Sequence, residues 1–579
     1  MRKETESGLA ELRAARRKSR SLFWAVGVLS IFANILMLTG PIYMLQVYDR
    51  VLGSGSVATL VALTGLVAFL YGIMGLLDHA RGRIMARVGA RFQAGLDRRV
   101  FDAALRKAAR HPEQASMAGL RDLEAVQRMM ISPVVMALFD LPWVPVFLFG
   151  ITLFHPWLGY LALGGGAVLV LLTLANQMAT RIPVIEANQA QAGADAMANH
   201  IVSEAEMVQA MGMRDAAFDR WQKARDAVLT RHLTASDLGG SFSAASKALR
   251  LFLQSAMLGL GAWLVIRGEV SPGAMIAASI LLGRALAPIE QAIGNWALVQ
   301  RATRGWSDLA QLLSEVPPEA SRTALPVPRA RLEVQGLTVI PPGEGQPVLR
   351  MLGFSVEPGQ AVGVIGPSGA GKSTLARALT GAWPAVAGKV RLDGAALDQY
   401  DPATLGRHIG YLPQRVQLFD GTIAENIARM SLTPDAALVV AAARKAAAHD
   451  MILKLPDGYD TRVTAAGGRL SGGQIQRIGL ARAMYGEPVI LVLDEPNSNL
   501  DNEGSQALNT AIRAMKADGR SVLIMAHRPA AIQECDMILM MEGGTRAAFG
   551  PKDEVLRKVL SNHEAVQSGL AQGLGGGVR

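Results

Sequence analysis

Three short runs in the last third of the chain contain the residue types that proteins use to bind and hydrolyse nucleotides. Gly366-Pro-Ser-Gly-Ala-Gly-Lys-Ser373 has the GxxxxGKS/T form of a phosphate-binding loop. Leu470-Ser-Gly-Gly-Gln474 follows it, and the apolar run Val489–Leu493 then leads into two carboxylates, Asp494 and Glu495. One phosphate-binding loop predicts only a bound nucleotide, whereas all three runs in this order predict a nucleotide-driven motor.

The phosphate-binding loop lies between an expected strand, Ala361–Ile365, and an expected helix, Thr374–Leu379. In that context the loop N–H groups and the helix N-terminus would face the phosphates. Lys372 would meet the β- and γ-phosphates, and Ser373 would ligate Mg²⁺. The residues expected to bind the nucleotide are Gly366, Pro367, Ser368, Gly369, Ala370, Gly371, Lys372, Ser373 and Thr374.

The two carboxylates have different expected roles. Asp494, at the end of its strand, would hold Mg²⁺ directly or through water. Glu495 is then placed to polarise the attacking water as the general base. The sequence therefore predicts nucleotide hydrolysis rather than binding alone.

Together these runs resemble the ATP-binding cassette (ABC) family, in which the LSGGQ run is the signature. The resemblance implies ATP and Mg²⁺ as cofactors. It also implies that Gln414 is the Q-loop residue that senses Mg²⁺ and contacts the membrane domain, that His527 is the switch histidine near the γ-phosphate, and that Asp501 is in the D-loop. The implied catalytic residues are Glu495, His527 and Gln414, and the implied metal ligands are Ser373, Gln414 and Asp494.

The signature run implies a second copy of the motor. Ser471, Gly472 and Gly473 are expected to open a helix over Gln474–Met484, so their N–H groups form a second anion site. In ABC motors the signature, Gln474 included, closes on the γ-phosphate of ATP held by the opposite subunit. A chain with one motor must therefore pair, most simply with itself, and we expect a homodimer.

One feature departs from the family pattern. ABC motors usually stack the adenine on an aromatic residue that precedes the phosphate-binding loop. The matching stretch, Leu337-Thr-Val-Ile-Pro-Pro342, contains none. Contact with adenine is then left to aliphatic or partner residues, and we expect loose base selectivity.

The first half of the chain decides what the motor drives. Of the 579 residues, 50% are hydrophobic, and the mean hydropathy is +0.24. Six apolar runs are long enough to cross a ~30 Å hydrocarbon core as helices of about 20 residues. In the fifth, only Leu251–Ile266 is free of charge, so Lys247 and Arg250 are expected to snorkel to the headgroups. The expected spans are Trp24–Gln46, Ala58–Leu77, Pro133–Phe154, Trp157–Gln177, Ser246–Ile266 and Pro272–Trp296.

Charge predicts the orientation. Basic residues are concentrated before the first span and between the second and third, whereas the connections after the first, third and fifth spans carry few charges. Basic segments stay in the cytoplasm. We therefore expect a protein of the bacterial inner membrane whose two termini and motor lie on the cytoplasmic side. The basic segments also explain most of the net charge of +10. No nucleic-acid partner is expected, because no base-stacking aromatic pattern accompanies them.

The N-terminal segment can form a basic amphipathic helix on the inner membrane face, or else a disordered basic tail. It is not expected to be a cleaved signal, because the apolar run after it is too long. Because this segment is short, we also do not expect an N-terminal peptidase-like domain before the first span. The single cysteine, Cys535, excludes an intrachain disulfide and a cysteine-cluster metal site.

The cytoplasmic stretches Arg81–Arg128 and Ala179–Gly240 are expected to extend the spans as long helices, with bends at His111-Pro112 and Met211–Asp215. The expected fold is thus an all-α six-span exporter domain fused to an α/β P-loop ABC ATPase. The expected domains are a basic amphipathic segment at 1–21, the six-span membrane domain at 22–315, a Pro-rich linker at 316–330, the nucleotide-binding domain at 331–565 and a Gly-rich tail at 566–579.

Four further runs narrow the resemblance. Gly421-Thr-Ile-Ala-Glu-Asn-Ile427 is similar to the exporter pattern after the Q-loop. Phe139-Asp-Leu-Pro-Trp143, Gly283-Arg-Ala-Leu-Ala-Pro-Ile-Glu290 and Asp494-Glu-Pro-Asn-Ser-Asn-Leu-Asp501 resemble the type I secretion ATPases of Gram-negative bacteria, in the protease-secretion (PrtD-like) branch. The resemblance implies ATP-driven export of an unfolded polypeptide with an uncleaved C-terminal signal, through a periplasmic membrane-fusion adaptor and an outer-membrane channel.

Two alternatives stay open at this point. An ABC exporter of lipid or amphiphilic small molecules would share every motor motif, whereas the six spans disfavour a soluble ABC ATPase that acts on DNA or ribosomes. Arg284, Gln291 and Asn295 fall on one face of the sixth span. A polar stripe inside a membrane usually faces a cavity, although hydrogen bonds between helices would also account for it.

Overall fold

The computed structural model describes residues 6–111, 117–319, 322–464, 470–498, 502–527 and 529–558. These residues form two compact units: the first comprises Met1–Arg106 and Ser116–Pro318, and the second comprises Lys107–Ala115 and Glu319–Arg579. The first unit is helical and the second is built on β-sheets.

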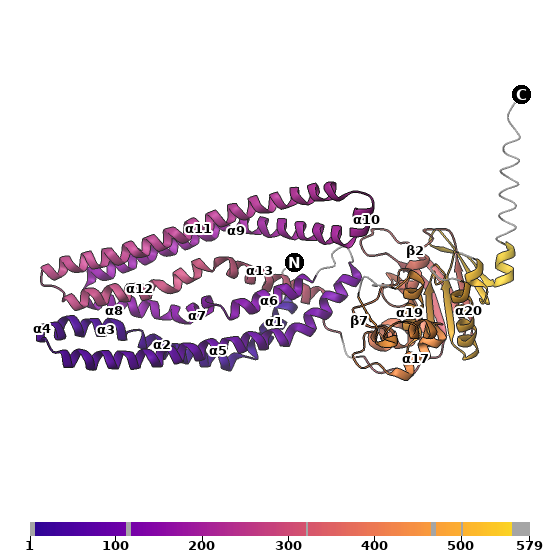
Figure 1. Cartoon of the computed structure of the whole chain (residues 1–579), viewed down its shortest axis with the longest axis horizontal. Helices are drawn as coiled ribbons and strands as arrows, with labels where there is room; N and C mark the ends of the chain where they lie inside the picture. Colours follow the sequence, from indigo (N-terminus) through magenta and orange to yellow (C-terminus); the bar gives the residue numbers. More distant parts are fainter. Residues whose placement is uncertain are drawn as a thin grey trace, which may run out of the picture. The chain divides into compact units, whose positions relative to one another are not determined.

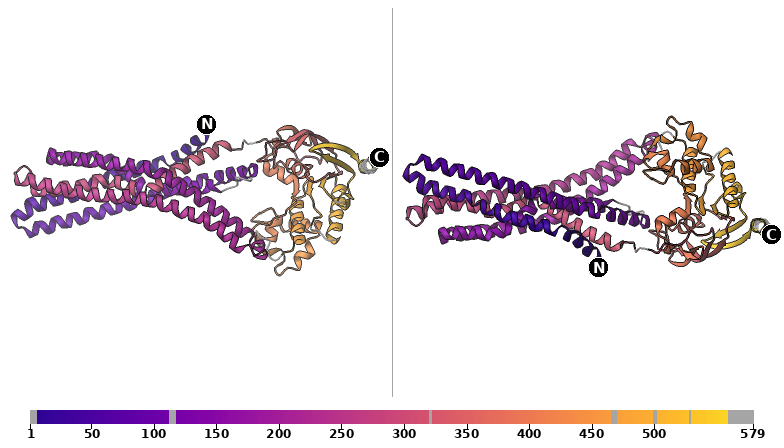
Figure 2. Two further views of the ribbon diagram at one scale, coloured as in Figure 1. Left: turned by 90° about the horizontal axis from the view of Figure 1, so that it is seen from above. Right: turned by 90° about the horizontal axis from the view of Figure 1, so that it is seen from below.

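In the helical unit α9 and α11 lie side by side along most of their length (Figure 1). Toward α10 this pair separates from the other helices of the unit (Figure 2). The helices are α1 (Glu6–Arg17), α2 (Arg20–Leu36), α3 (Thr39–Gln46), η1 (Val47–Val51), α4 (Leu52–Ser54), α5 (Val57–Arg110), α6 (Ala118–Met130), α7 (Pro133–Asp140), η3 (Leu141–Trp143), α8 (Val144–Phe154), α9 (Pro156–Ser203), α10 (Ala205–Ala210), α11 (Arg214–Ile266), α12 (Pro272–Gly294) and α13 (Trp296–Glu315).

Six stretches of the described chain are helical, long and apolar enough to cross a membrane. None of the apolar residues in the best window of α5 is buried inside the protein, so this surface must contact lipid or another chain. The six expected spans are confirmed, except that the sixth ends at Gly294, before Trp296. The stretches are Arg20–Ser54, Val57–Arg110, Pro133–Phe154, Pro156–Ser203, Arg214–Ile266 and Pro272–Gly294.

The expected helical extensions are also present, because α9 and α11 continue far beyond their apolar parts. The bend expected at Met211–Asp215 is a turn in which Gly212 takes a φ of 64°. The short helix α10 precedes it. The other expected bend involves Pro112, which lies outside the described residues.

The N-terminal segment is a helix, but its apolar face does not point to the membrane. Leu12 is fully buried among residues of α5, α6 and α13. A Cβ at Gly8 would lie 2.1 Å from the carbonyl oxygen of Ala310, so this glycine allows the close approach of α1 to α13. Glu11 adds an ion pair of 3.0 Å with Arg99. The apolar face of α1 is thus covered by protein and not by lipid, and the place of α1 at the inner membrane face stays a prediction.

Two expectations about polar residues in the spans need correction. Arg250 does not snorkel but pairs with Glu290 of α12 at 2.8 Å. Asn295 stands at the break between α12 and α13, and its side-chain amide donates to the carbonyl oxygen of Gln291 at 3.0 Å. Gln291 is exposed and Arg284 is half-buried, so the polar stripe is interrupted at Asn295 by a bond within its own helix.

A buried ionic network joins α2, α5 and α7. The side chain of Arg81 is only 3% exposed and donates to Asp140 at 2.9 Å and to Asp78 at 3.0 Å. The amide of Asn34 donates to the same oxygen of Asp140 at 2.7 Å. Asp140 belongs to the Phe139–Trp143 run, so this run ties three helices together.

The second unit contains a six-stranded sheet in the order β12-β11-β3-β10-β9-β6 and a four-stranded sheet in the order β2-β1-β4-β5. The strands are β1 (Leu332–Val339), β2 (Leu349–Val356), β3 (Ala361–Ile365), β4 (Ala387–Leu392), β5 (Ala395–Ala396), β6 (Ile409–Leu412), β7 (Gly421–Thr422), β8 (Arg462–Val463), β9 (Ile490–Asp494), β10 (Ser521–Met525), β11 (Met537–Glu542) and β12 (Thr545–Pro551). The helices that pack on them are α14 (Lys372–Leu379), α15 (Pro402–His408), α16 (Ile423–Ile427), α17 (Ala436–Lys445), α18 (His449–Leu453), α19 (Gly472–Met484) and α20 (Asn502–Ala517).

Candidate nucleotide site

The parallel register of three strands brings the expected catalytic residues together. In β6 and β9, Leu412 lies opposite Leu493, and in β9 and β10, Asp494 lies opposite Met525. The residues that follow these strands therefore leave the same edge of the sheet. At this edge Gln414, Glu495 and His527 meet, although they are far apart in the sequence.

The carboxylate of Glu495 is held at both oxygens. Nε2 of His527 lies 2.9 Å from one oxygen, and Nε2 of Gln414 donates to the other at 3.1 Å. The backbone of Glu495 has a φ of 51°, a strained conformation for a residue other than glycine. Its N–H donates to the carbonyl oxygen of Met525 at 3.0 Å, so the neighbouring strand fixes this conformation.

The phosphate-binding loop follows β3, which pairs with β10 on the other side. Gly366 has a φ of 154°, and a Cβ there would lie 2.2 Å from the carbonyl oxygen of Met541. Gly371, with a φ of 93°, caps α14, and a Cβ there would lie 2.7 Å from the side chain of Leu349. Both positions therefore require glycine, and α14 begins at Lys372, as the sequence predicts.

The ammonium of Lys372 lies inside the loop. Its Nζ donates to the carbonyl oxygens of Gly366 and Pro367, each at 2.9 Å. Burial lowers the pKa of Lys372, while the negative charges of Glu495 and Asp494 act to raise it. This cation is thus placed between the glycine-rich loop and both carboxylates.

Asp494 is almost completely buried, with 1% of its surface exposed. Burial raises the pKa of its carboxyl, whereas a hydrogen bond from Ser373 lowers it. Within the described chain its Oδ1 has no hydrogen-bond partner. A buried carboxylate oxygen without a donor, next to a serine hydroxyl, is a suitable environment for a hard divalent cation.

The signature run begins α19 through a reciprocal cap. Ser471 accepts from the N–H of Gln474 at 3.3 Å, and the side chain of Gln474 accepts from the N–H of Ser471 at 2.8 Å. The helix starts at Gly472, two residues before the expected start at Gln474. Asp501 lies outside the described residues.

Sequence reasoning missed Gln476, whose buried side chain donates to the carbonyl oxygen of Pro496 at 3.2 Å. This bond joins the signature helix to the loop that begins at Glu495. No sequence signal identifies Gln476, because its partner is a backbone atom in a distant segment.

It also missed Arg482 on α19. Its guanidinium donates to the side chain of Asn426 at 2.8 Å, to the carbonyl of Asn426 at 2.9 Å and to the carbonyl of Gln417 at 2.9 Å. These contacts join the signature helix to the segment after the Q-loop. The Gly421–Ile427 run contains Asn426, but nothing in the sequence pairs it with an arginine 56 residues away.

Aliphatic residues lie beside the phosphate-binding loop at Gly371. Besides Leu349, the side chain of Val348 would lie 3.2 Å from a Cβ at this glycine. Aliphatic residues of this kind are expected to contact the adenine, because the sequence has no aromatic residue there. Loose base selectivity stays a prediction.

Comparison with known families agrees with this architecture. The family described as ABC transporter matches residues 349–498, and the ABC transporter transmembrane region matches residues 23–286. A solved structure of a bacterial Atm1-family ABC exporter with ATP bound has the same fold, with a TM-score of 0.81, 23% identity and coverage of 95% of this chain and 98% of that one. The helical unit and the sheet-based unit are therefore those of a multi-pass ABC transporter.

Curated relatives narrow the class. Over 552 residues the chain is 45% identical to the type I secretion system ATP-binding protein PrsD of Rhizobium meliloti, with 95% of both chains covered. It is 29% identical to the cyclolysin secretion/processing ATP-binding protein CyaB of Bordetella pertussis, with 96% of this chain and 79% of that one covered. The leukotoxin translocation ATP-binding protein LktB of Mannheimia haemolytica is 28% identical, with 93% and 77% covered.

The chain belongs to the type I secretion ATP-binding proteins of the ABC transporter family. The resemblance found from its motifs is thereby confirmed, and so is the fold expected from them. Membership means that the chain binds ATP and couples ATP hydrolysis to transport.

Proposed function

We propose that this chain is the ABC component of a type I secretion system, which exports an unfolded polypeptide with a C-terminal signal across the inner membrane. The observation that carries the proposal is the 45% identity to PrsD over 95% of both chains. Two further relatives are named for cyclolysin secretion and leukotoxin translocation. These names favour export of a protein over export of a lipid or an amphiphile.

In this proposal the cluster at the ends of β6, β9 and β10 hydrolyses ATP. Glu495 accepts a proton from the attacking water as general base. Gln414 and His527 hold its two carboxylate oxygens at 3.1 and 2.9 Å, so they orient the base, and His527 lies near the γ-phosphate. Lys372 and the N–H groups of Gly366–Thr374 bind the phosphates.

Mg²⁺ fits the residues present. Ser373, Asp494 and Gln414 would hold it, and the free buried oxygen of Asp494 supports this assignment. When bound, Mg²⁺ would neutralise charge on the β- and γ-phosphate oxygens.

We further propose a homodimer in which Ser471–Gln474 and the D-loop residue Asp501 of one subunit face the nucleotide of the other. The extension of α11 beyond its span supports a second copy, because Phe218, Leu229 and Leu233 are 54%, 47% and 61% exposed. A second subunit would cover these side chains, which supports the proposal without requiring it.

The positive-inside rule places both termini and the ATPase in the cytoplasm of a bacterium, with the spans in the inner membrane. A periplasmic membrane-fusion adaptor and an outer-membrane channel complete the proposed path, and a secreted protein is its cargo. The proposed domains keep the bounds given above, with the boundary between motor and membrane domain in the linker 316–330. The face of Arg284 and Gln291 is the proposed polar wall of the path within the spans.

The test is export of a reporter that carries a C-terminal secretion signal, in cells that supply the adaptor and the outer channel. Glu495→Gln should abolish export, whereas Glu554→Gln, which removes an exposed carboxylate far from the site in the sequence, should export like the wild type. Both variants are first checked for equal amounts in the membrane.

In vitro, the ATPase of the purified chain should respond to a secretion-signal peptide. A response to lipids or amphiphiles and never to such a peptide would contradict protein export. Equal export by Glu495→Gln and the wild type would contradict the proposed site.

A further inference from the structure

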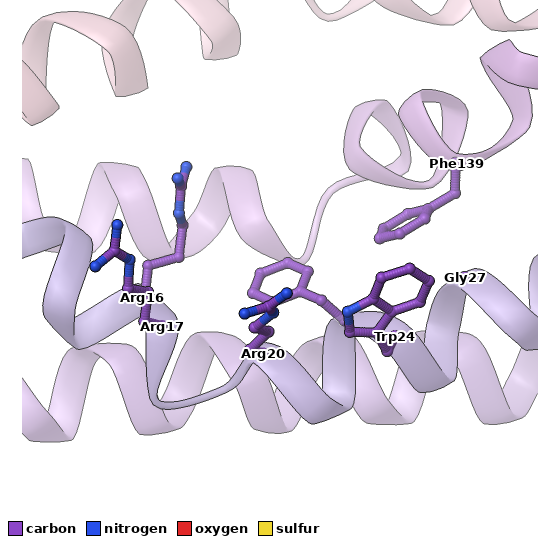
Figure 3. Close-up of a pocket in the computed structure, with 7 residues that line it drawn as sticks. Arg16, Arg17, Arg20, Trp24, Gly27 and Phe139 are labelled. Carbon is purple, nitrogen blue, oxygen red and sulfur yellow. The ribbon is translucent and has the colours of Figure 1, made fainter.

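Where α1 meets α2, three arginines, three aromatic residues and a glycine line one pocket. The pocket has a volume of about 580 Å³ and is lined by Arg16, Arg17, Arg20, Phe23, Trp24, Gly27 and Phe139. In Figure 3 the rings of Trp24 and Phe139 face each other at one end, and the arginine side chains gather at the other. Neither the ATPase site nor the proposed path uses these residues.

Two of the arginines are available to a ligand. Arg16 already lies over the ring of Trp306, with 5.9 Å from its guanidinium carbon to the ring centre. Arg17 and Arg20 are exposed, and no acidic residue in the described chain forms an ion pair with either. Two guanidinium groups that line the same pocket are suited to a phosphate, which each can bind through paired N–H donors.

The other end of the pocket is apolar and open. Trp24 is 66% exposed, although it is large and apolar. Gly27 presents no side chain, and the nearest atom to a Cβ built there is a ring carbon of Phe139 at 4.0 Å. The glycine thus lets the Phe139 ring approach α2, and Trp24 and Phe139 form the walls of the apolar end of the pocket.

The charge pattern of the sequence assigns the pocket to the depth of a lipid headgroup. No charged residue occurs between Arg20 and Asp49, that is, over 48 − 20 = 28 residues. At a rise of about 1.5 Å per residue, α2, the turn after it and α3 reach at most ~42 Å over this stretch, enough to cross the ~30 Å hydrocarbon core and enter the headgroup layers. Arg20 is then at the level of the headgroup phosphates, and Trp24, one turn further in, is in the interfacial aromatic belt.

We propose that this pocket binds one anionic phospholipid of the inner leaflet, with its phosphate on Arg17 and Arg20 and the start of an acyl chain between Trp24 and Phe139, beside Gly27. Because the orientation follows the positive-inside rule, the partner is a lipid of the cytoplasmic leaflet, which carries the anionic lipids. Since Phe139 precedes Asp140 of the buried network, the lipid would contact the run that ties α2, α5 and α7 together.

The test uses the purified full-length protein in detergent, titrated with phosphatidylglycerol or with phosphatidylcholine of the same acyl chains, and native mass spectrometry to count bound lipids. The wild type should bind one phosphatidylglycerol per subunit in preference to phosphatidylcholine. Arg17→Gln with Arg20→Gln should weaken this binding by about tenfold or more. The matched control, Arg13→Gln with Lys18→Gln, removes equal charge from exposed positions that do not line the pocket and should change affinity by less than about threefold.

A second variant, Gly27→Leu, places a bulky side chain at the apolar end of the pocket and keeps every charge. It should also weaken phosphatidylglycerol binding, and it carries the test alone if the arginine variant fails to fold. Millimolar inorganic phosphate should not displace the lipid. Equal loss in the control, unchanged binding in Gly27→Leu, or displacement by phosphate would overturn the proposal, because each would mean general surface attraction or a headgroup site without a chain contact.

Discussion

Replacing Asp140 with leucine should destabilise the helical unit, because it leaves Arg81 buried without its main partner. Arg81 is 3% exposed and donates to Asp140 at 2.9 Å. Removing one member of a buried ion pair costs about 3–5 kcal/mol, since the remaining charge stays uncompensated. Asp78, whose side chain is 46% exposed, still accepts from Arg81 at 3.0 Å, so we expect the lower end of that range, about 3 kcal/mol.

The measurement is the thermal midpoint of the purified protein in detergent. At about 2–4 °C per kcal/mol for domains of 150–250 residues, the midpoint should fall by roughly 6–12 °C. The double variant Arg81→Met with Asp140→Leu replaces the pair by apolar side chains and should return to within about 1 kcal/mol of the wild type.

The matched control is Glu124→Gln, which breaks the pair between Arg128 and Glu124. This pair is 2.6 Å long, but its side chains are 59% and 48% exposed, so its loss should cost less than about 0.5 kcal/mol. If the single and the double variant show the same fall in thermal midpoint, the loss of Asp140 does not leave an uncompensated charge on Arg81, and the reasoning is refuted.

Four further outcomes are expected. Glu495→Gln should retain binding of Mg-ATP and lose on the order of 10²-fold or more in turnover; near-normal phosphate release would transfer the role of base to another group, His527 first. GTP should be hydrolysed within about tenfold of the ATP rate, because aromatic stacking contributes about 1–3 kcal/mol to base binding elsewhere; a preference for ATP of about a hundredfold or more would mean that another residue selects the base. Burial and the charge of Asp308 raise the pKa of Asp122 from 3.8 to about 6, so the folded protein binds this proton more tightly than the unfolded chain and loses stability as the pH rises from 3.8 to about 6. Asp122→Asn should therefore raise the thermal midpoint at neutral pH and change it little near pH 4. An equal gain at both pH values would contradict the assignment. Arg482→Lys should lower ATPase activity without loss of ATP binding, because a lysine cannot reproduce the forked contacts to Asn426 and Gln417; unchanged activity would show that the link from α19 to the Q-loop segment is not needed.

The catalytic edge could be predicted from the sequence because its members end strands. Each of Gln414, Glu495 and His527 follows an apolar run, and parallel strands in one sheet end at one edge. The glycines of the phosphate-binding loop were equally predictable, and Gly366 and Gly371 are fixed by backbone approaches that any side chain would block. Asp501 belongs to the same pattern, but it lies outside the described residues.

Contacts between helices could not be predicted in the same way. Arg81 and Asp140 are 59 residues apart, and Arg250 and Glu290 lie on different spans. Hydropathy treats Arg250 as a charge that must reach the headgroups, because the sequence does not say which carboxylate faces it. What covers the N-terminal helix could not be predicted for a related reason. Its amphipathic pattern predicts an apolar surface, and only packing decides whether lipid or α13 covers that surface.

The charges around Lys372 explain why a divalent cation belongs to the proposed reaction. The described cluster sets the cations of Lys372 and Arg377 against the carboxylates of Asp494 and Glu495, which gives a net charge of +2 − 2 = 0 before any nucleotide is bound. A nucleotide adds further negative charge at the same edge, and burial already disfavours the charged form of Asp494. Hydrogen bonds from Ser373 to Asp494 and from Gln414 to Glu495 stabilise the two carboxylates but do not neutralise their negative charge. A bound cation at the free oxygen of Asp494 would restore the balance, while His527 and Gln414 hold the carboxylate of Glu495 for its proposed role as the base.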